Sequence, residues 1–170
     1  MSLFLHEIVH LLLSLMIGVF VWDKFKKPFS AFFAALLGGV LIDFDHLYDY
    51  FVAFGFSFDL NSFLSGNYFE INNKIIVPFH AWEWVFLLLI LYLFLSLKSK
   101  SRIRNKKLFV LPIILALALG ISSHLIFDTI ANHMLPQSYF LTYRIMNRYT
   151  VQKMVTLGHY EKVLKEGESK

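Results

Sequence analysis

Residues 108–133 read LFVLPIILALALGISSHLIFDTIANH, and this stretch decides the fold class. Its apolar part is close to the roughly 20 residues that a helix needs to cross about 30 Å of hydrocarbon. Further apolar runs of similar length cover residues 3–22, 29 to about 46, and 75–97. The sequence therefore predicts an all-α integral membrane protein, built as a bundle of about four transmembrane helices.

The composition agrees with a membrane protein and excludes several other classes. Of the 170 residues, 57% are apolar and only 16% are charged, whereas about a quarter are charged in soluble domains. The net charge of +4 comes mostly from two short basic loops, so a membrane explains it better than a nucleic-acid partner does. The chain has no Cys, so any metal must be held by His and carboxylate side chains.

We expect two parts along the chain. Residues 1–135 contain the transmembrane bundle with its metal site, including a polar loop over residues 59–74. Residues 136–170 form an interfacial or soluble tail. Because the tail opens with aromatic and basic side chains, we predict a C-terminal interfacial helix there and not a fifth span.

The basic residues of the loops predict the orientation. The first connection carries three Lys and the third, residues 98–107, carries six basic residues, whereas the second carries only Lys74. Basic loops stay on the cytoplasmic side. We therefore expect a multi-pass protein of the inner cell membrane with both termini toward the outer face.

Ionisable side chains inside the predicted spans indicate a functional site, because such groups are costly in lipid. With a rise of about 1.5 Å per residue, they lie at heights of roughly 18 to 30 Å above the cytoplasmic ends of their helices. All four spans therefore place them in one layer near the outer face. The members of this layer are His10, Asp43, His46, His80, His124 and Asp128.

Their spacing predicts a metal site. His124 and Asp128 are four residues apart, and Asp43 and His46 are three apart, so each pair shares a helix face. Imidazole nitrogen and carboxylate oxygen form the ligand set that zinc accepts. We expect one to three divalent ions, with zinc as the metal, held by the six residues of the layer. Asp43 and Asp128 are the candidates for bridging carboxylates.

Two carboxylates are also candidates for catalytic roles. We expect Asp45 either to orient a ligand His without binding the metal itself or to act as a base. Asp128 is the second catalytic candidate, in addition to its role as a ligand.

Several of these segments resemble one protein family. They are Leu41-Ile42-Asp43-Phe44-Asp45-His46, an early His in the first helix, His80 at the opening of a span, and Gly120-Ile121-Ser122-Ser123-His124-Leu125-Ile126-Phe127-Asp128. The family is that of the bacterial and archaeal membrane-bound, metal-dependent hydrolases, which includes the LexA-regulated inner-membrane protein of enteric bacteria. It is distantly similar to zinc-dependent phospholipase C.

The resemblance covers roughly residues 5–135. It implies the site residues His10, Asp43, Asp45, His46, His80, His124 and Asp128. Where the family has a His-Arg-Gly-x-Thr-His-Ser stretch, this chain has only Pro78-Phe79-His80. Together, the residues and the resemblance lead us to expect metal-assisted hydrolysis of a phosphoester, with a membrane lipid as substrate.

Two alternative functions use the same residues. His6-Glu7-Ile8-Val9-His10 is a His-Glu-x-x-His motif, which in zincins supplies two zinc ligands and a general base. In a membrane helix it resembles the site-2 intramembrane proteases, with Asp43, Asp45 or Asp128 as third ligand. In the hydrolase hypothesis only His10 of this motif is a ligand. The second alternative is a metal or proton conduit, which would distribute its ligands through the membrane rather than in one layer.

Overall fold

The computed structural model of the chain describes residues 3–98 and 104–161, and in these residues every regular element is helical. The prediction of an all-α protein is therefore confirmed. The elements are α1 (Leu3–Phe25), α2 (Pro28–Gly39), η1 (Leu41–Asp45), α3 (His46–Phe54), α4 (Leu60–Ser65), α5 (Tyr68–Asn72), α6 (Trp82–Lys98), α7 (Arg104–Ala131), η2 (Pro136–Tyr139), α8 (Leu141–Met146) and α9 (Val151–Met154).

The chain forms two compact units, each assembled from two segments. The first unit contains the chain up to Asp43 together with Ala81–Asp128. The second contains Phe44–His80 and the chain from Thr129 onward. Within the second unit the C-terminal segment packs with an earlier part of the chain, and the boundary expected after residue 135 stays a prediction.

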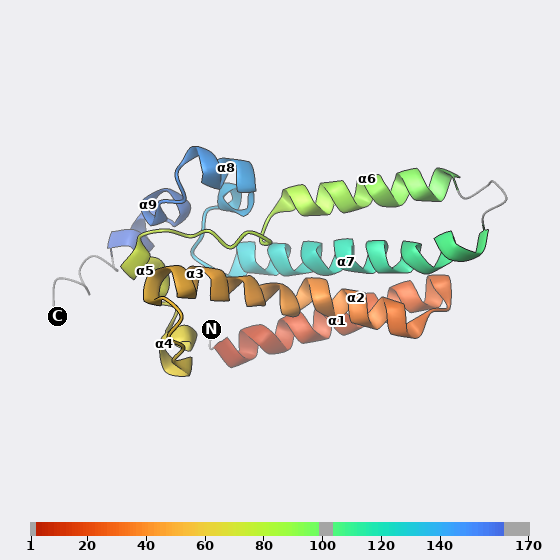
Figure 1. Cartoon of the computed structure of the whole chain (residues 1–170), viewed down its shortest axis with the longest axis horizontal. Coiled ribbons are helices and arrows are strands. Elements are labelled where there is room, and N and C mark those ends of the chain that lie inside the picture. The colour runs from red at the N-terminus through yellow and green to blue at the C-terminus, as the bar shows by residue number, and fades with distance from the viewer. Residues whose placement is uncertain (1–2, 99–103, 162–170) are drawn as a thin grey trace. The chain divides into compact units, whose positions relative to one another are not determined.

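The first unit contains the two helices that are long and apolar enough to cross a membrane within the described residues. They are Phe4–Phe25 in α1 and Phe109–Ala131 in α7, with 22 and 23 residues. Figure 1 shows α1, α2, α6 and α7 extending in nearly the same direction, with the first turn of α1 at the same end as the last turns of α7. These helices agree with the predicted membrane protein.

A bent helix pair raises the possible number of spans to three. The predicted second run is one α-helix only as far as Gly39, and the helices on the two sides of the break at Val40 differ in direction by 48°. α6 has 17 described residues, or about 25 Å at the helical rise. Residues 99–103, in the basic third connection, lie outside the described part of the chain. The predicted bundle of four spans is therefore not confirmed.

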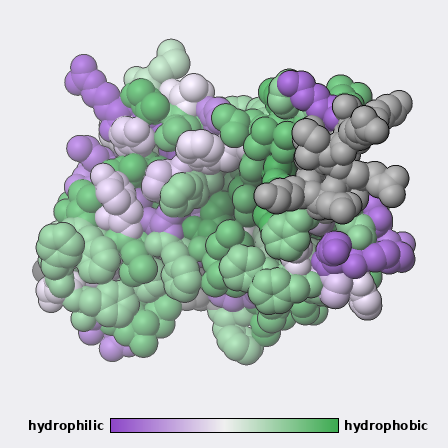
Figure 2. Space-filling view, turned by 45° about the vertical axis from the view of Figure 1, so that its right-hand side comes forward, coloured by the Kyte–Doolittle hydropathy of each residue, from purple (hydrophilic) through white to green (hydrophobic). Residues whose placement is uncertain are grey.

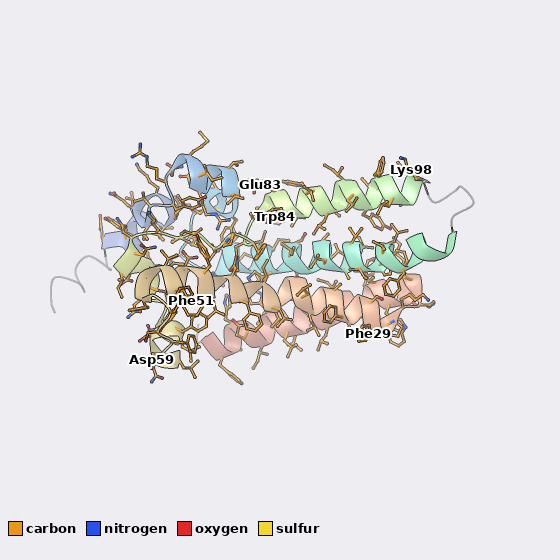
Figure 3. All side chains as sticks on the ribbon, viewed as in Figure 1. Phe29, Phe51, Asp59, Glu83, Trp84 and Lys98 are labelled. Carbon is orange, nitrogen blue, oxygen red and sulfur yellow. The ribbon has the colours of Figure 1, made fainter. Side chains whose placement is uncertain are left out.

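Large apolar side chains cover much of the surface. Figure 2 shows them over most of the face in view, and Phe29 at the start of α2 is 80% exposed (Figure 3). α6 has Glu83 and Trp84 in its first turn and Lys98 as its last described residue, with an almost wholly apolar stretch between them (Figure 3). Lipid is the environment in which such a surface is stable.

Small residues lie where α2 and α7 meet in the first unit. A Cβ atom at Gly38 would lie 2.7 Å from the carbonyl oxygen of Leu117, and one at Gly120 would lie 2.8 Å from the carbonyl oxygen of Ala35. The backbones of α2 and α7 are therefore nearly in contact, as small residues permit in membrane helices. This contact holds the end of α2 against the part of α7 that carries His124.

The second unit contains shorter helices than the sequence suggested. α4 and α5 lie in the segment expected to be a polar loop, and α4 begins where the Asp59 carboxylate accepts a hydrogen bond of 2.8 Å from the amide of Ser62. In the described residues of the tail, η2, α8 and α9 are found rather than one longer helix, and the predicted C-terminal interfacial helix is not confirmed. α8 ends before Arg148 and Tyr149, which have positive φ angles that an α-helix excludes.

After α8 the tail turns back onto an earlier segment of the second unit. Thr150 pairs with Lys74 in an isolated antiparallel bridge. Buried apolar side chains from both segments then form one cluster, whose fully or nearly fully buried members are Ile75, Val77, Val151, Met154 and Val155. This cluster explains why the C-terminal segment belongs to the second unit.

Candidate metal centre

Five ionisable side chains of the first unit converge at one end of its helices. His6 and His10 lie one turn apart near the start of α1, and Asp43 lies in η1, just after α2. His124 and Asp128 lie one turn apart near the end of α7. The elements therefore bring together residues that are separated by up to 122 positions in the chain, as His6 and Asp128 are.

The first group of ligand atoms is formed by His6, His10 and Asp128. Nε2 of His6 lies 2.8 Å from Nε2 of His10, and the two nitrogens lie 3.0 Å and 3.2 Å from Oδ1 of Asp128. Each imidazole Nε2 carries at most one proton, so hydrogen bonds account for at most two of these three contacts. A single cation between the three atoms satisfies all of them.

The second group is formed by His10, Asp43 and His124, whose ligand atoms lie within 4.8 Å of one another. Nε2 of His124 lies 3.4 Å from Oδ1 of Asp43 and 3.4 Å from Oδ2 of Asp128. The two oxygens of Asp128 therefore approach different histidines. This is the arrangement of a carboxylate that bridges two neighbouring ions.

The distances suit a metal of the zinc type. Donor atoms about 2.0 to 2.1 Å from a tetrahedral ion lie roughly 3.3 Å apart. The contacts among these side chains range from 2.8 to 3.4 Å. The donor set of three imidazoles and two carboxylates fits zinc and similar divalent ions.

Each of three predicted ligand histidines directs its Nδ1 to another protein group. Nδ1 of His124 lies 3.1 Å from the carbonyl oxygen of Gly39, the last residue of α2. Because a carbonyl can only accept, Nδ1 carries the proton and Nε2 keeps the lone pair that a metal requires.

In the second unit, Nδ1 of His46 lies 3.1 Å from the hydroxyl of Tyr68. Nδ1 of His80 lies 2.9 Å from Oδ1 of Asp45, and the other carboxylate oxygen of Asp45 accepts a hydrogen bond from the amide of Phe79. Partners of this kind orient metal-ligating histidines in proteins. Asp45 therefore lies next to His80 in the second unit, and its predicted role of orienting a ligand stays a prediction.

Burial distinguishes two of the ligand candidates, His10 and His124, from their neighbour Glu7. His10 and His124 are buried, and their rings stack with centroids 3.9 Å apart. Glu7 is only partly buried, but it lies close enough to Asp43 and His124 to interact with both electrostatically.

The structure brings together four of the six predicted ligands in the first unit, namely His10, Asp43, His124 and Asp128. His46 and His80 lie in the second unit, and their membership of the same site stays a prediction. The sequence left out His6, although its four-residue spacing from His10 was visible, because it lies near the terminus. Nothing in the sequence pointed to Tyr68.

Comparison of the chain with protein-family models, with curated proteins and with solved structures finds no match. The resemblance to the membrane-bound hydrolases therefore stays an expectation from the sequence. The side chains described above are what supports a function.

Proposed function

We propose that this chain is a membrane-embedded, metal-dependent hydrolase that cleaves a phosphoester of a lipid or a lipid-linked substrate. In this proposal the chain crosses the membrane four times. Its site lies toward the outer face, as the loop charges predict. The expected metal is zinc.

The observation that carries the proposal is the position of Asp128 between two groups of histidines. One oxygen faces His6 and His10, and the other faces His124. A mononuclear site needs three or four ligands. Five converging ligands, one of them bridging, suit a pair of ions.

Ions in such a site would lower the pKa of a bound water toward about 7 and offset the charge that develops on the phosphoryl oxygens. The chain itself holds the histidine side chains in fixed orientations. The carbonyl of Gly39 keeps His124 in the tautomer that can bind a metal, and Asp45 orients His80. Phe127 packs against the rings of His6 and His10 and limits the rotation of both.

A phosphoester is favoured over other substrates because two ions can stabilise both the attacking and the leaving oxygen of an in-line displacement. The lipid part of the substrate follows from the surroundings. The helices that carry the site are apolar on their outer surfaces, with Leu5 of α1 and Ile126 of α7 about half exposed. An amphiphile whose head group reaches the site would keep its chains in lipid.

The proposal can be tested with a panel of lipids. Purified, zinc-loaded protein in mixed micelles is given phosphatidic acid, phosphatidylglycerol, phosphatidylethanolamine and a polyprenyl phosphate, and released phosphate or phospho-head group is measured by ³¹P NMR. We expect release from at least one lipid, and a loss of at least about 100-fold in turnover for His124→Ala and Asp128→Asn. His133→Ala, a change at an exposed histidine of the second unit, is the control. If no lipid is cleaved, or if the two site variants remain as active as the control, the proposal fails.

A second candidate is an intramembrane zinc protease. The observation that favours it is the contact of His6 and His10, the two ligands of the His-Glu-x-x-His motif, with Oδ1 of Asp128 as a third ligand. In this case Glu7 is the general base, whereas Asp43 is not required. Glu7→Gln should then abolish cleavage of a membrane-spanning peptide while Asp43→Asn retains it. If the chain is a phosphoesterase, Asp43→Asn should abolish cleavage of a lipid while Glu7→Gln retains it.

A further inference from the structure

Residues 75–80 form a stretch without regular secondary structure in which three side chains are buried. Ile75, Val77 and His80 are each exposed by less than 5%. Backbone groups in such a stretch need partners, because a buried polar group without one costs free energy. Here the partners come largely from two buried ionisable side chains.

The first of these side chains is Asp49 in α3, which is 1% exposed. Its carboxylate oxygens accept hydrogen bonds from the amides of Ile76 and Val77, at 2.7 Å and 2.8 Å. Hydrogen bonds to a carboxylate are stronger than those between neutral groups. The amide side of the stretch is thus fixed at two consecutive residues.

The second is Arg144 in α8, which is completely buried. Its Nη1 donates to the carbonyl oxygens of Ile76 and Val77, both at 2.8 Å. Its Nη2 donates to the carbonyl oxygen of His80 at 2.9 Å. One guanidinium group therefore fixes the carbonyl side of the stretch as far as the histidine itself.

The backbone between the two side chains is strained. Val77 has a φ angle of +29°, which a β-branched residue rarely adopts. Strain of this kind persists only where the surroundings determine the conformation strongly, and it is often found at functional sites. Asp49 and Arg144 bind the amide and the carbonyl group of Val77, so they hold the strained residue directly.

We propose that Arg144 and Asp49 are positioning residues for His80. They set the backbone at residues 76–80 so that the imidazole meets Asp45, to which Nδ1 of His80 lies within 2.9 Å. The inference rests on the proposed function, in which His80 serves the hydrolytic site. It gives the C-terminal segment a role in that site, since Arg144 comes from the tail.

The test measures His80 itself in the full-length protein. Protein labelled with [¹⁵N]histidine in detergent micelles gives long-range ¹H–¹⁵N spectra, in which the ring-nitrogen shifts report protonation and hydrogen bonding. The His80 signals are assigned by their loss in His80→Ala. The variants are Arg144→Lys, which keeps the charge but lacks the fork that reaches three carbonyls, and Asp49→Asn. Arg148→Lys, at an exposed arginine four residues further along the chain, is the matched control.

We expect the His80 nitrogen shifts to change in Arg144→Lys and in Asp49→Asn, while those of His124 stay as in the wild type and show that the first unit is intact. Arg148→Lys should change neither. In the phosphoesterase assay, Arg144→Lys should lower kcat by at least about tenfold with KM within about twofold, because it disturbs a group that acts in the reaction rather than in binding.

Unchanged His80 shifts in both variants would overturn the inference, whatever happens to thermal stability. Changed His80 shifts in a protein that cleaves no lipid would support the positioning role and reject the proposed function. The two hypotheses therefore fail separately.

Discussion

Nε2 of His6 lies 2.8 Å from Nε2 of His10, one turn further along α1. Two imidazole lone pairs repel each other at this distance unless a proton or a cation lies between them. Because both nitrogens also approach the same carboxylate oxygen, a cation explains the geometry best.

This contact predicts that His6 is a metal ligand. Purified protein should contain at least one stoichiometric divalent metal, with zinc as the expected ion, measured by elemental analysis. His6→Ala should weaken metal binding by at least about 100-fold, since losing a ligand costs more than losing a group that only orients one. Competition with a chelator of known affinity measures the change.

Glu7→Gln is the control for this experiment, because Glu7 neighbours His6 but is not in either ligand group. It should keep its metal. Protein that holds no metal even after incubation with zinc would refute the metal centre as a whole.

We expect Asp128→Asn to lower the metal content of the protein more than Asp43→Asn does. Asp128 contacts His6 and His10 through one oxygen and His124 through the other, whereas Asp43 belongs to the second ligand group, with His10 and His124. Asp128→Asn should therefore deplete both ion positions, and Asp43→Asn only one. The measurement is the ratio of metal to protein after dialysis, with Asp59→Asn, an exposed helix cap, as control. Equal stoichiometry for Asp128→Asn and Asp43→Asn would contradict a bridging carboxylate.

The close contact between α2 and α7 should not tolerate a methyl group. Gly120→Ala places a Cβ 2.8 Å from a backbone oxygen, so we expect a loss of about 1 to 3 kcal/mol of unfolding free energy. Gly158→Ala adds the same methyl group in open space and should leave stability nearly unchanged. Thermal unfolding in detergent compares the two. Equal midpoints would show that the helices can separate without cost.

The orientation can be tested by cysteine labelling, because the chain has no native Cys. Cysteines are introduced as Asn67→Cys, in the second connection, and Ser101→Cys, in the basic third connection. In intact cells a membrane-impermeant maleimide should label only the first of them, since basic loops remain in the cytoplasm. If the reagent labels the Ser101→Cys protein and not the Asn67→Cys protein, the orientation is the reverse of the predicted one.

Much of the fold could be predicted from hydropathy, because the cost of exposing backbone in lipid forces long apolar segments into helices. The break at Val40 was not predicted, since the residues on both sides of it are apolar and hydropathy does not report direction. The burial of part of the tail was not predicted for a different reason. Its aromatic and basic residues suggested an interface. Arg144 is instead completely buried, and it donates hydrogen bonds to a segment that is distant in the sequence.

The residues of the candidate metal centre could be predicted in part because spacing along a helix determines which side chains share a face. His10, His124 and Asp128 were predicted in this way, and the structure brings them together. His6 was excluded by an argument about depth, which assumed that a residue near the terminus could not reach the site. Its nitrogen nevertheless lies 3.0 Å from Asp128, because α1 begins at Leu3 and already includes His6 in its first turns.

The carbonyl of Gly39, which accepts from His124, is available because α2 stops there. The length of a structural helix thus selects the chemical form of an imidazole on another helix. Each residue of an α-helix turns the chain by about 100°. One residue inserted or deleted between Pro28 and Gly39 would swing that carbonyl away from the imidazole, although every ligand would still be present in the chain. The number of residues in this apolar helix therefore matters to the candidate metal centre as much as the number of histidines does.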